Sequence, residues 1–268
     1  MTKRTYTPEP LPPNKPDSSW AVRFNRWTLW TSRHYLAILL VLIGAFITLP
    51  FAAPVFMRAG LTGVGEAVYA MYSPLCHQFA FRSWFLFGEQ TIYPRGEASV
   101  PGVNPYEYYL PEVMRALDGR LDNSVLAMEN NSRAFLGDAR MGYKVALCQR
   151  DVAIYVALFA GGVVYSIPRV RRYLRPVPIW LYVLLGLGPI GLDGFSQLLS
   201  YPPFELWPVR ESTPLFRTVT GALFGLMNAW LAFPYLETSA RDIIREIEAK
   251  FEQRRRRQTG QRAIREAD

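Results

Sequence analysis

Residues 36–51 read LAILLVLIGAFITLPF, and this uncharged apolar run decides the fold class. With its neighbours it covers about residues 35–56, which as a helix can cross the roughly 30 Å hydrocarbon core of a bilayer. Further apolar blocks occupy about residues 146–167, 176–199 and 215–235. The pattern predicts an all-α membrane protein, a bundle of about four transmembrane helices that crosses the cell membrane several times.

The composition is that of a membrane protein with a basic surface. Of the 268 residues, 50% are hydrophobic, and the net charge is +8. The positive charge is split among short clusters beside the apolar blocks, as expected near lipid headgroups rather than on a nucleic-acid-binding face. Two cysteines are too few for a disulfide scaffold. We therefore expect the lipid bilayer, and no nucleic acid, as a partner.

Composition also divides the chain into segments. Residues 1–33 are a proline-rich tail followed by an aromatic and basic stretch, so we expect disorder and then an interfacial segment. Residues 34–236 form the predicted four-span domain, with a short interfacial helix at about residues 61–72. Residues 89–142 are polar and form an extracytoplasmic insertion. Residues 237–268 have helical apolar spacing with many basic side chains, which predicts an amphipathic helix in a cytoplasmic tail.

The basic clusters set the orientation. Arginines precede the first predicted span, fill the short loop at residues 169–175, and recur after the fourth span. With four spans all three clusters fall on one side of the membrane, and basic clusters favour the cytoplasmic side. The sequence therefore predicts that both termini are cytoplasmic.

This topology brings the outer ends of all four spans to the same side of the membrane. An ionisable side chain inside a span is costly, so it indicates a functional or structural partner. Asp193 is the deepest such residue, and Arg82, Arg150 and Arg217 are its candidate partners. Glycines and Pro189 around it predict an irregular helix there. The expected polar cluster comprises Arg82, Arg150, Gln197 and Arg217, beside Cys76, His77, Cys148, Asp151 and Asp193.

The two cysteines admit three interpretations. An extracytoplasmic location permits a disulfide between Cys76 and Cys148. Alternatively, Cys76 or His77, Cys148 and a carboxylate from Asp151 or Asp193 bind a zinc-like divalent metal, because these are standard zinc ligands. A redox-active thiol pair is the third interpretation. The sequence leaves the cofactor question open.

Small residues predict close helix packing in the last apolar block. Gly221 and Gly225 are four positions apart, which places them on one helix face. Such a small-xxx-small pattern allows two helix backbones to approach closely.

Three motifs resemble those of the DUF2085 family of small predicted membrane proteins. Residues 73–78 read SPLCHQ and, with Arg82-Ser83 and Phe87-Gly88, are similar to the family's first motif. Residues 147–155 read LCQRDVAIY and are similar to the second, and residues 189–225 carry the third. The resemblance covers roughly residues 70–235 and implies a multi-span membrane fold, but no activity. The long insertion, and Asp151 where many relatives have a cysteine, depart from the family pattern.

Several function classes remain compatible with these residues. No nucleophile–base–orienter set, Walker loop or HExxH motif is present, which favours an accessory membrane protein whose outer polar cluster is structural or binds a metal. Such a protein would dock on a larger membrane complex. The arginines around Asp193 suit a phosphate and support the alternative of an enzyme acting on a lipid-linked or envelope substrate. In that case Asp193 or His77 would be the acid or base. A small transporter is the third hypothesis.

Overall fold

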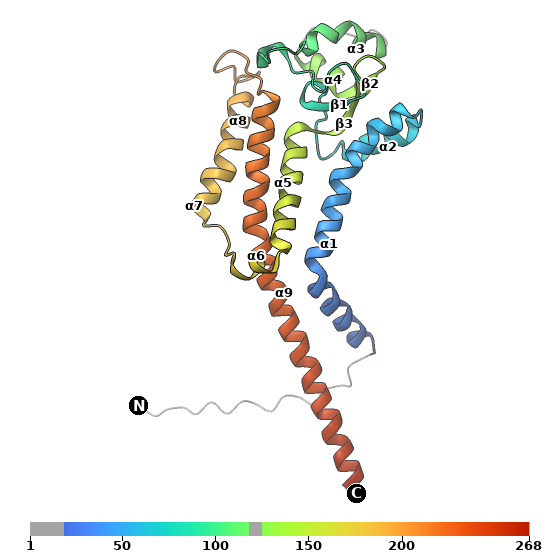
Figure 1. Cartoon of the computed structure of the whole chain (residues 1–268), viewed down its shortest axis with the longest axis vertical. Coiled ribbons are helices and arrows are strands. Elements are labelled where there is room, and N and C mark those ends of the chain that lie inside the picture. The colour runs from blue at the N-terminus through green and yellow to red at the C-terminus, as the bar shows by residue number, and fades with distance from the viewer. Residues whose placement is uncertain (1–18, 118–124, 268) are drawn as a thin grey trace. The chain divides into compact units, whose positions relative to one another are not determined.

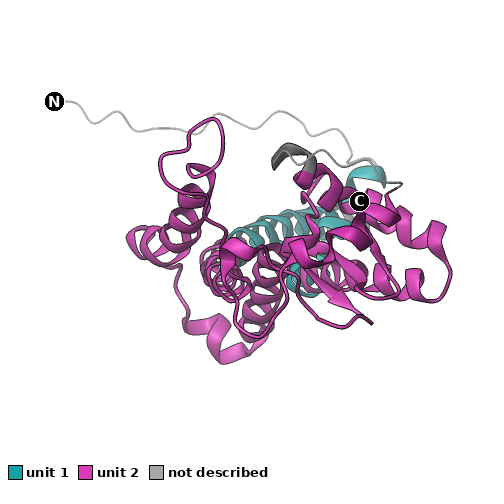
Figure 2. Ribbon diagram, turned by 90° about the horizontal axis from the view of Figure 1, so that it is seen from above, with its two compact units in different colours: residues 1–38, 237–268 teal, residues 39–236 magenta. Residues whose placement is uncertain are grey.

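The computed structural model describes residues 19–117 and 125–267, so the predicted tail at residues 1–18 lies outside the described residues. The chain is mostly helical and divides into two compact units, residues 1–38 with 237–268 and residues 39–236 (Figure 2). Its elements are α1 (Ser19–Arg58), α2 (Thr62–Tyr72), η1 (Ala80–Arg82), β1 (Ser83–Leu86), η2 (Gly96–Ala98), η3 (Tyr106–Tyr109), α3 (Leu110–Ala116), α4 (Val125–Ala134), β2 (Gly137–Asp138), β3 (Gly142–Cys148), α5 (Gln149–Ser166), α6 (Pro168–Tyr173), α7 (Ile179–Leu181), η4 (Tyr182–Leu187), α8 (Gly188–Leu198) and α9 (Pro214–Ala267).

The larger unit is built on a bundle of α1, α5, α8 and the first part of α9 (Figure 1). The ring of Phe46 in α1 lies 4.7 Å from that of Tyr155, and Gly44 contacts Phe159, so α1 and α5 run antiparallel. Gly221 of α9 lies against Arg150 of α5, and Gly225, one turn further along α9, lies against Ile154, one turn further along α5. Helices α5 and α9 are therefore parallel neighbours.

Glycines allow α5 and α9 to approach closely, as their spacing predicts. A Cβ atom on Gly221 would lie 2.6 Å from the carbonyl oxygen of Arg150. A Cβ atom on Gly225 would overlap the carbonyl oxygen of Ile154. Any side chain at these positions would force the two helices apart, so glycine is required here for packing rather than for backbone conformation.

The bundle carries apolar side chains on its outside and polar ones inside. On α8, Leu192 and Phe195 are 76% and 66% exposed, whereas Asp193 and Gln197 on the same helix are buried. This is the reverse of a water-soluble helix and suits a lipid environment. Within the described residues, three helices are long and apolar enough to cross a membrane: Ser19–Arg58, Ile179–Leu198 and Pro214–Gly260.

The second predicted span differs from the expectation. Residues 146–148 belong to strand β3, and the helix that follows, α5, begins only at Gln149. Arg150 and Asp151 lie in its first turn, which lowers its hydropathy, and α5 is not among the three helices that meet the length and composition criteria. It nevertheless packs inside the bundle, with Ala153, Ala157 and Gly162 buried.

The irregular backbone of the third predicted span lies earlier than expected. Asp193 sits in the regular α-helix α8, whereas the preceding residues 182–187 form a π-helix. Gly186 in this segment approaches the side chain of Met227 on α9. The π-helical turn therefore lies where this helix packs against α9, and not at the buried carboxylate of Asp193.

The all-α prediction is wrong for the part of the chain around the predicted insertion, which contains a small antiparallel sheet of order β1–β3–β2. Strand β1 precedes residues 89–142, and β3 begins at their end. Ser83 pairs with Cys148, and Phe85 pairs with Lys144. The sheet and the surrounding loops enclose a mainly aromatic core, which includes Phe79, Phe81, Phe85, Tyr93, Tyr106, Tyr109, Phe135 and Met141. Residues with a polar average composition thus fold around buried aromatic side chains.

The smaller unit combines the start of α1 with the end of α9. Arg33 donates to Glu248 at 2.6 Å, and the Tyr35 hydroxyl donates to Glu237 at 2.7 Å. The predicted aromatic and basic segment is helical here and continuous with the rest of α1, with Trp20 and Trp27 more than 60% exposed. Helix α9 likewise continues through the predicted basic tail.

Candidate functional site

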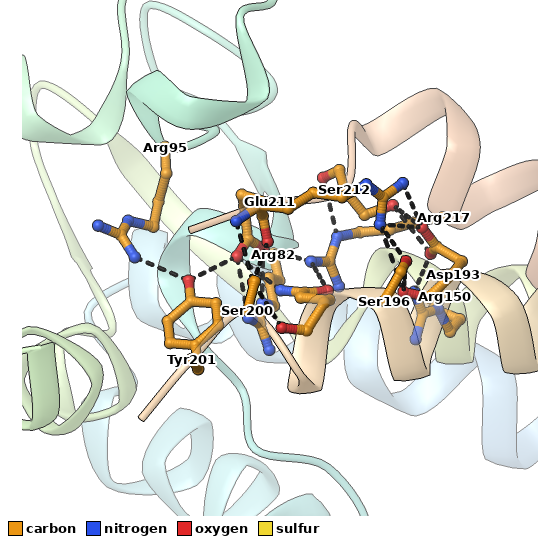
Figure 3. A network of polar contacts seen from close by, with 12 residues as sticks. Arg82, Arg95, Arg150, Asp193, Ser196, Ser200, Tyr201, Glu211, Ser212 and Arg217 are labelled. Atoms are coloured by element: carbon orange, nitrogen blue, oxygen red, sulfur yellow. Dashed lines mark hydrogen bonds and ion pairs between the residues drawn. The ribbon is translucent and has the colours of Figure 1, made fainter. Parts of the chain in front are cut away.

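The candidate site lies in the larger unit, at the end of the bundle where α8 ends and α5 and α9 begin (Figure 1). The loop of residues 199–213 joins α8 to α9 and supplies part of the site. Strand β3 runs directly into α5, with Cys148 as the residue before the first helical turn. Because three helix ends and the sheet meet here, polar side chains distant in sequence become neighbours (Figure 3).

Glu211, in the loop before α9, is the centre of one buried cluster. Its carboxylate accepts hydrogen bonds from Nε and Nη2 of Arg82 at 2.9 and 3.0 Å. It also accepts from Arg217, from Nε2 of Gln197 at 2.6 Å, and from the Tyr201 hydroxyl at 2.9 Å. Burial alone would raise the pKa of Glu211, but the two arginines hold it below its usual value.

Asp193 is the centre of a second cluster, and its side chain is fully buried. Arg150 donates to one of its oxygens, and Arg210 donates to the other at 3.1 and 3.2 Å. The Ser212 hydroxyl lies 2.8 and 2.9 Å from the two oxygens. Both oxygens of Asp193 are therefore occupied by protein donors, and a carboxylate in that state is poorly suited to accept a proton from a substrate.

The two clusters form one network across the loop. Arg217 donates to the carbonyl oxygen of Ser212 at 3.2 Å, and Ser212 bonds Asp193. On the other side, Tyr201 receives a hydrogen bond of 2.8 Å from Arg95. Burial raises the pKa of the Tyr201 phenol to about 12, so it remains a donor to Glu211 at neutral pH.

A cavity of about 860 Å³ opens beside this network. Its polar wall contains Arg82, Arg150 and Arg217. Its remaining wall is mixed, with one acidic side chain, and consists of His77, Phe79, Glu129, Gly194, Gln197, Leu198, Tyr201, Pro202 and Pro203. Four arginines, the three in the wall and Arg210, surround the two buried carboxylates, so the network carries a surplus of positive charge.

Only part of the predicted metal set lies together. One sulfur each of Cys76 and Cys148 and a carboxylate oxygen of Asp151 all lie within 4.8 Å of one another. Cys148 Sγ donates to Asp151 at 3.1 Å. His77 instead stacks on Phe79 and lines the cavity.

The remaining predicted ligand, Asp193, is occupied by Arg150, Arg210 and Ser212. Both cysteines are free thiols in the structure. The hydrogen bond with Cys148, and then burial, raise the pKa of the Cys76 thiol.

The ion pairs around Asp193 differ from the expected ones. Arg150 bonds Asp193 as expected, whereas Arg82 and Arg217 bond Glu211. Sequence reasoning missed Glu211 because its loop has nearly balanced charge and no apolar pattern. The one signal available was a carboxylate three residues before an apolar block that has an arginine near its start.

Sequence reasoning also missed a buried lysine in the sheet. Lys144 in β3 is fully buried, and its ammonium group donates to the carbonyl oxygens of Gln78 and Arg133 at 2.7 Å and of Ser132 at 3.3 Å. Burial lowers the pKa of Lys144 to about 7, and the three carbonyls stabilise the ammonium form against that desolvation. Lys144 thus ties the turn that carries Cys76 and His77 to α4.

Comparison with known proteins supports the resemblance found in the sequence. Residues 130–231 match the family described as "Predicted membrane protein (DUF2085)". The matched range holds the whole of the second and third motifs, so the resemblance is confirmed there, while the first motif at residues 73–88 lies outside it. An uncharacterised protein of Methanocaldococcus jannaschii is 22% identical over 207 residues, which is 75% of this chain and 92% of that protein. No solved structure matches the chain.

Proposed function

We propose that this chain, a membrane protein whose residues 130–231 match DUF2085, binds the phosphate group of an anionic amphiphile in the cavity at the end of its bundle. The observation that carries the proposal is the convergence of Arg82, Arg150 and Arg217 on one cavity with a partly apolar wall. Guanidinium groups bind phosphate oxygens through paired, charge-assisted hydrogen bonds. The apolar wall would contact the first carbons of the ligand.

The three arginines retain donors for such a ligand. Arg82 and Arg217 bond protein acceptors through Nε and Nη2, and Arg150 does so through Nη2. Among the described residues no hydrogen bond involves Nη1 of any of the three, and Nε of Arg150 is buried without a partner. The paired carboxylates hold the guanidinium planes in place, so little side-chain entropy would be lost on binding.

The orientation of the helices supports a topology of four spans, in which α5 crosses the membrane in addition to the three helices that meet the length and composition criteria. The contacts make α1 and α8 antiparallel to α5 and α9, and α5, with 18 residues, is about 27 Å long. In this topology both termini are cytoplasmic, and the arginine cavity opens at the outer leaflet of the cell membrane. Its location at a helix end would let a lipid headgroup enter from the bilayer interface.

Binding without turnover is favoured over catalysis. Asp193 and Glu211 are engaged by arginines, which leaves His77 and Glu129 as the cavity-lining side chains that an enzyme of phosphate-bearing lipids would use as acid or base. A transporter would need a carboxylate that can exchange its hydrogen-bond partners during transport. Asp193 and Glu211 are each held by several protein donors at once, which does not favour such an exchange. A binding role suits an accessory subunit of a membrane complex.

The proposal is tested by titrating purified protein in neutral detergent with short-chain phosphatidate, matched phosphatidylcholine, and inorganic phosphate. We expect phosphatidate to bind more tightly than phosphatidylcholine, and inorganic phosphate to compete weakly. Arg150→Gln should weaken phosphatidate binding by roughly 10- to 150-fold, since a charged hydrogen bond contributes about 1.5–3 kcal/mol. Arg150→Lys should retain part of the affinity.

The matched control is Arg140→Gln. Arg140 bonds Glu89 and Glu112 and does not line the cavity, so its loss should leave affinity unchanged. Equal affinity for the two lipids, or equal loss in Arg140→Gln and Arg150→Gln, would refute the proposal. Release of free phosphate from bound phosphatidate, abolished in His77→Ala, would instead support the enzyme alternative.

A further inference from the structure

Three potential metal ligands converge beside the cavity, on elements that are distant in sequence. Cys76 follows α2, Cys148 ends β3, and Asp151 lies in the first turn of α5. Their ligand atoms lie within 4.8 Å of one another. Cys76 is 7% exposed and packs in an apolar cluster, so the group is not a loose surface arrangement.

We infer that Cys76, Cys148 and Asp151 form a binding site for a divalent cation of the Zn²⁺ class. In tetrahedral geometry Zn–S bonds of about 2.3 Å place two sulfur ligands about 3.8 Å apart, and a carboxylate oxygen fits at a similar separation. The observed spacing accommodates these distances with small side-chain movements. Two thiolates with one carboxylate suit zinc better than magnesium or calcium, which prefer oxygen ligands alone.

The backbone around the sulfurs is arranged to receive negative charge. The backbone N–H groups of Gln78 and Cys148 donate to Cys76 Sγ at 3.4 and 3.3 Å. Cys148 occupies the position before the first turn of α5, where the helix dipole favours a thiolate. Cys76 therefore already has two backbone donors that a metal-bound thiolate would use, and Cys148 lies at a helix N-terminus.

Binding needs no oxidant. The two S–H bonds break, two metal–sulfur bonds and one metal–oxygen bond form, and two protons leave to solvent or buffer. A disulfide between the same sulfurs would require the removal of two electrons by an added oxidant. With three protein ligands, the fourth tetrahedral position would hold a water molecule.

The site would connect the turn after α2 to the start of α5. The chain neighbours of the ligands, His77 and Arg150, line the proposed anion cavity. A bound cation would fix the positions of both residues by joining Cys76 and Cys148, which are 72 residues apart in the sequence. This inference goes beyond phosphate binding and does not depend on it.

The decisive experiment combines elemental analysis of full-length protein in detergent with thiol titration. We expect about one zinc per chain, and thiols that react with a thiol reagent only after a chelator is added. Replacement by Co²⁺ should give the absorption of cobalt–thiolate bonds. Two reactive thiols with no uptake of added Zn²⁺ would overturn the inference, as would thiols that appear only after a reductant.

Asp151→Asn separates a metal site from a disulfide, because it leaves both cysteines in place. We expect at least a tenfold loss of Zn²⁺ affinity in this variant, measured by competition with a chromogenic chelator. Asp242→Asn is the control, since Asp242 is an exposed carboxylate paired with Arg245. Unchanged affinity in Asp151→Asn would overturn the assignment of Asp151. Should that variant fail to fold, thiol protection in the wild-type protein still decides the inference.

Discussion

Glu211→Gln removes the negative charge that Arg82 and Arg217 share, with little change in side-chain size. The glutamine retains one carbonyl oxygen but introduces an NH₂ group that faces two guanidinium groups. The side chains of Glu211 and Arg217 are 1% and 4% exposed, so solvent cannot replace the lost charge. The substitution therefore leaves at least one arginine buried without its carboxylate.

The expected cost is about 3–5 kcal/mol, the usual penalty for removing one partner of a buried ion pair. The hydrogen bonds from Gln197 and Tyr201 to the carboxylate would weaken as well. For a folded unit of this size, such a loss corresponds to a fall in melting temperature of roughly 10 °C.

The measurement is thermal unfolding in one detergent, followed by tryptophan fluorescence and circular dichroism. Glu205→Gln is the matched control, because Glu205 is an exposed carboxylate in the same loop. We expect the control to change stability by less than about 0.5 kcal/mol. If the two variants melted at the same temperature, Glu211 would not be the centre of a stabilising network.

The same carboxylate predicts a dependence on pH. Because the pKa of Glu211 is lowered in the folded protein, the unfolded chain takes up the proton first as the pH falls. As the pH falls below the usual glutamate pKa of 4.5, the free energy of unfolding should therefore decrease. The decrease should continue until the pH reaches the lowered pKa of Glu211 in the folded protein. Glu211→Gln should show a shallower acid dependence than wild type, and parallel curves would contradict this account.

Further predictions concern packing, the buried lysine and topology. Gly225→Ala should cost about 1–3 kcal/mol because its Cβ atom overlaps the carbonyl oxygen of Ile154, whereas Gly191→Ala, with no atom within 4 Å, should be neutral or slightly stabilising in the same melting assay. Lys144→Met should cost about 2–4 kcal/mol by leaving carbonyl oxygens without donors, and exposed Lys250→Met should cost almost nothing; equal melting points would argue against a structural role for Lys144. A C-terminal tag should resist external protease in sealed right-side-out vesicles until they are lysed, and digestion from outside would refute the cytoplasmic termini.

Local patterns in the sequence were sufficient for the helices but not for the sheet. Long apolar runs predicted the core segments of α1, α8 and α9, because hydropathy and helical spacing are properties of neighbouring residues. Because an apolar stretch does not distinguish a buried strand from a helix, the sequence predicts helix at residues 146–148, which form the end of strand β3. The aromatic core at residues 79–141 escaped notice because its members are widely spaced among polar residues.

The sequence by itself determined that this chain is a membrane protein, resembles DUF2085, and carries arginines and an aspartate near the ends of its apolar segments. Only the tertiary structure decided which of these groups meet. It assigned Arg82 and Arg217 to Glu211 and left Asp193 with Arg150 and Arg210. It also placed the His77 ring against Phe79, outside the group formed by the two cysteines and Asp151. The reason is physical: hydropathy and charge act locally along the chain, whereas the pairing of a buried charge depends on which helix ends and loops pack together.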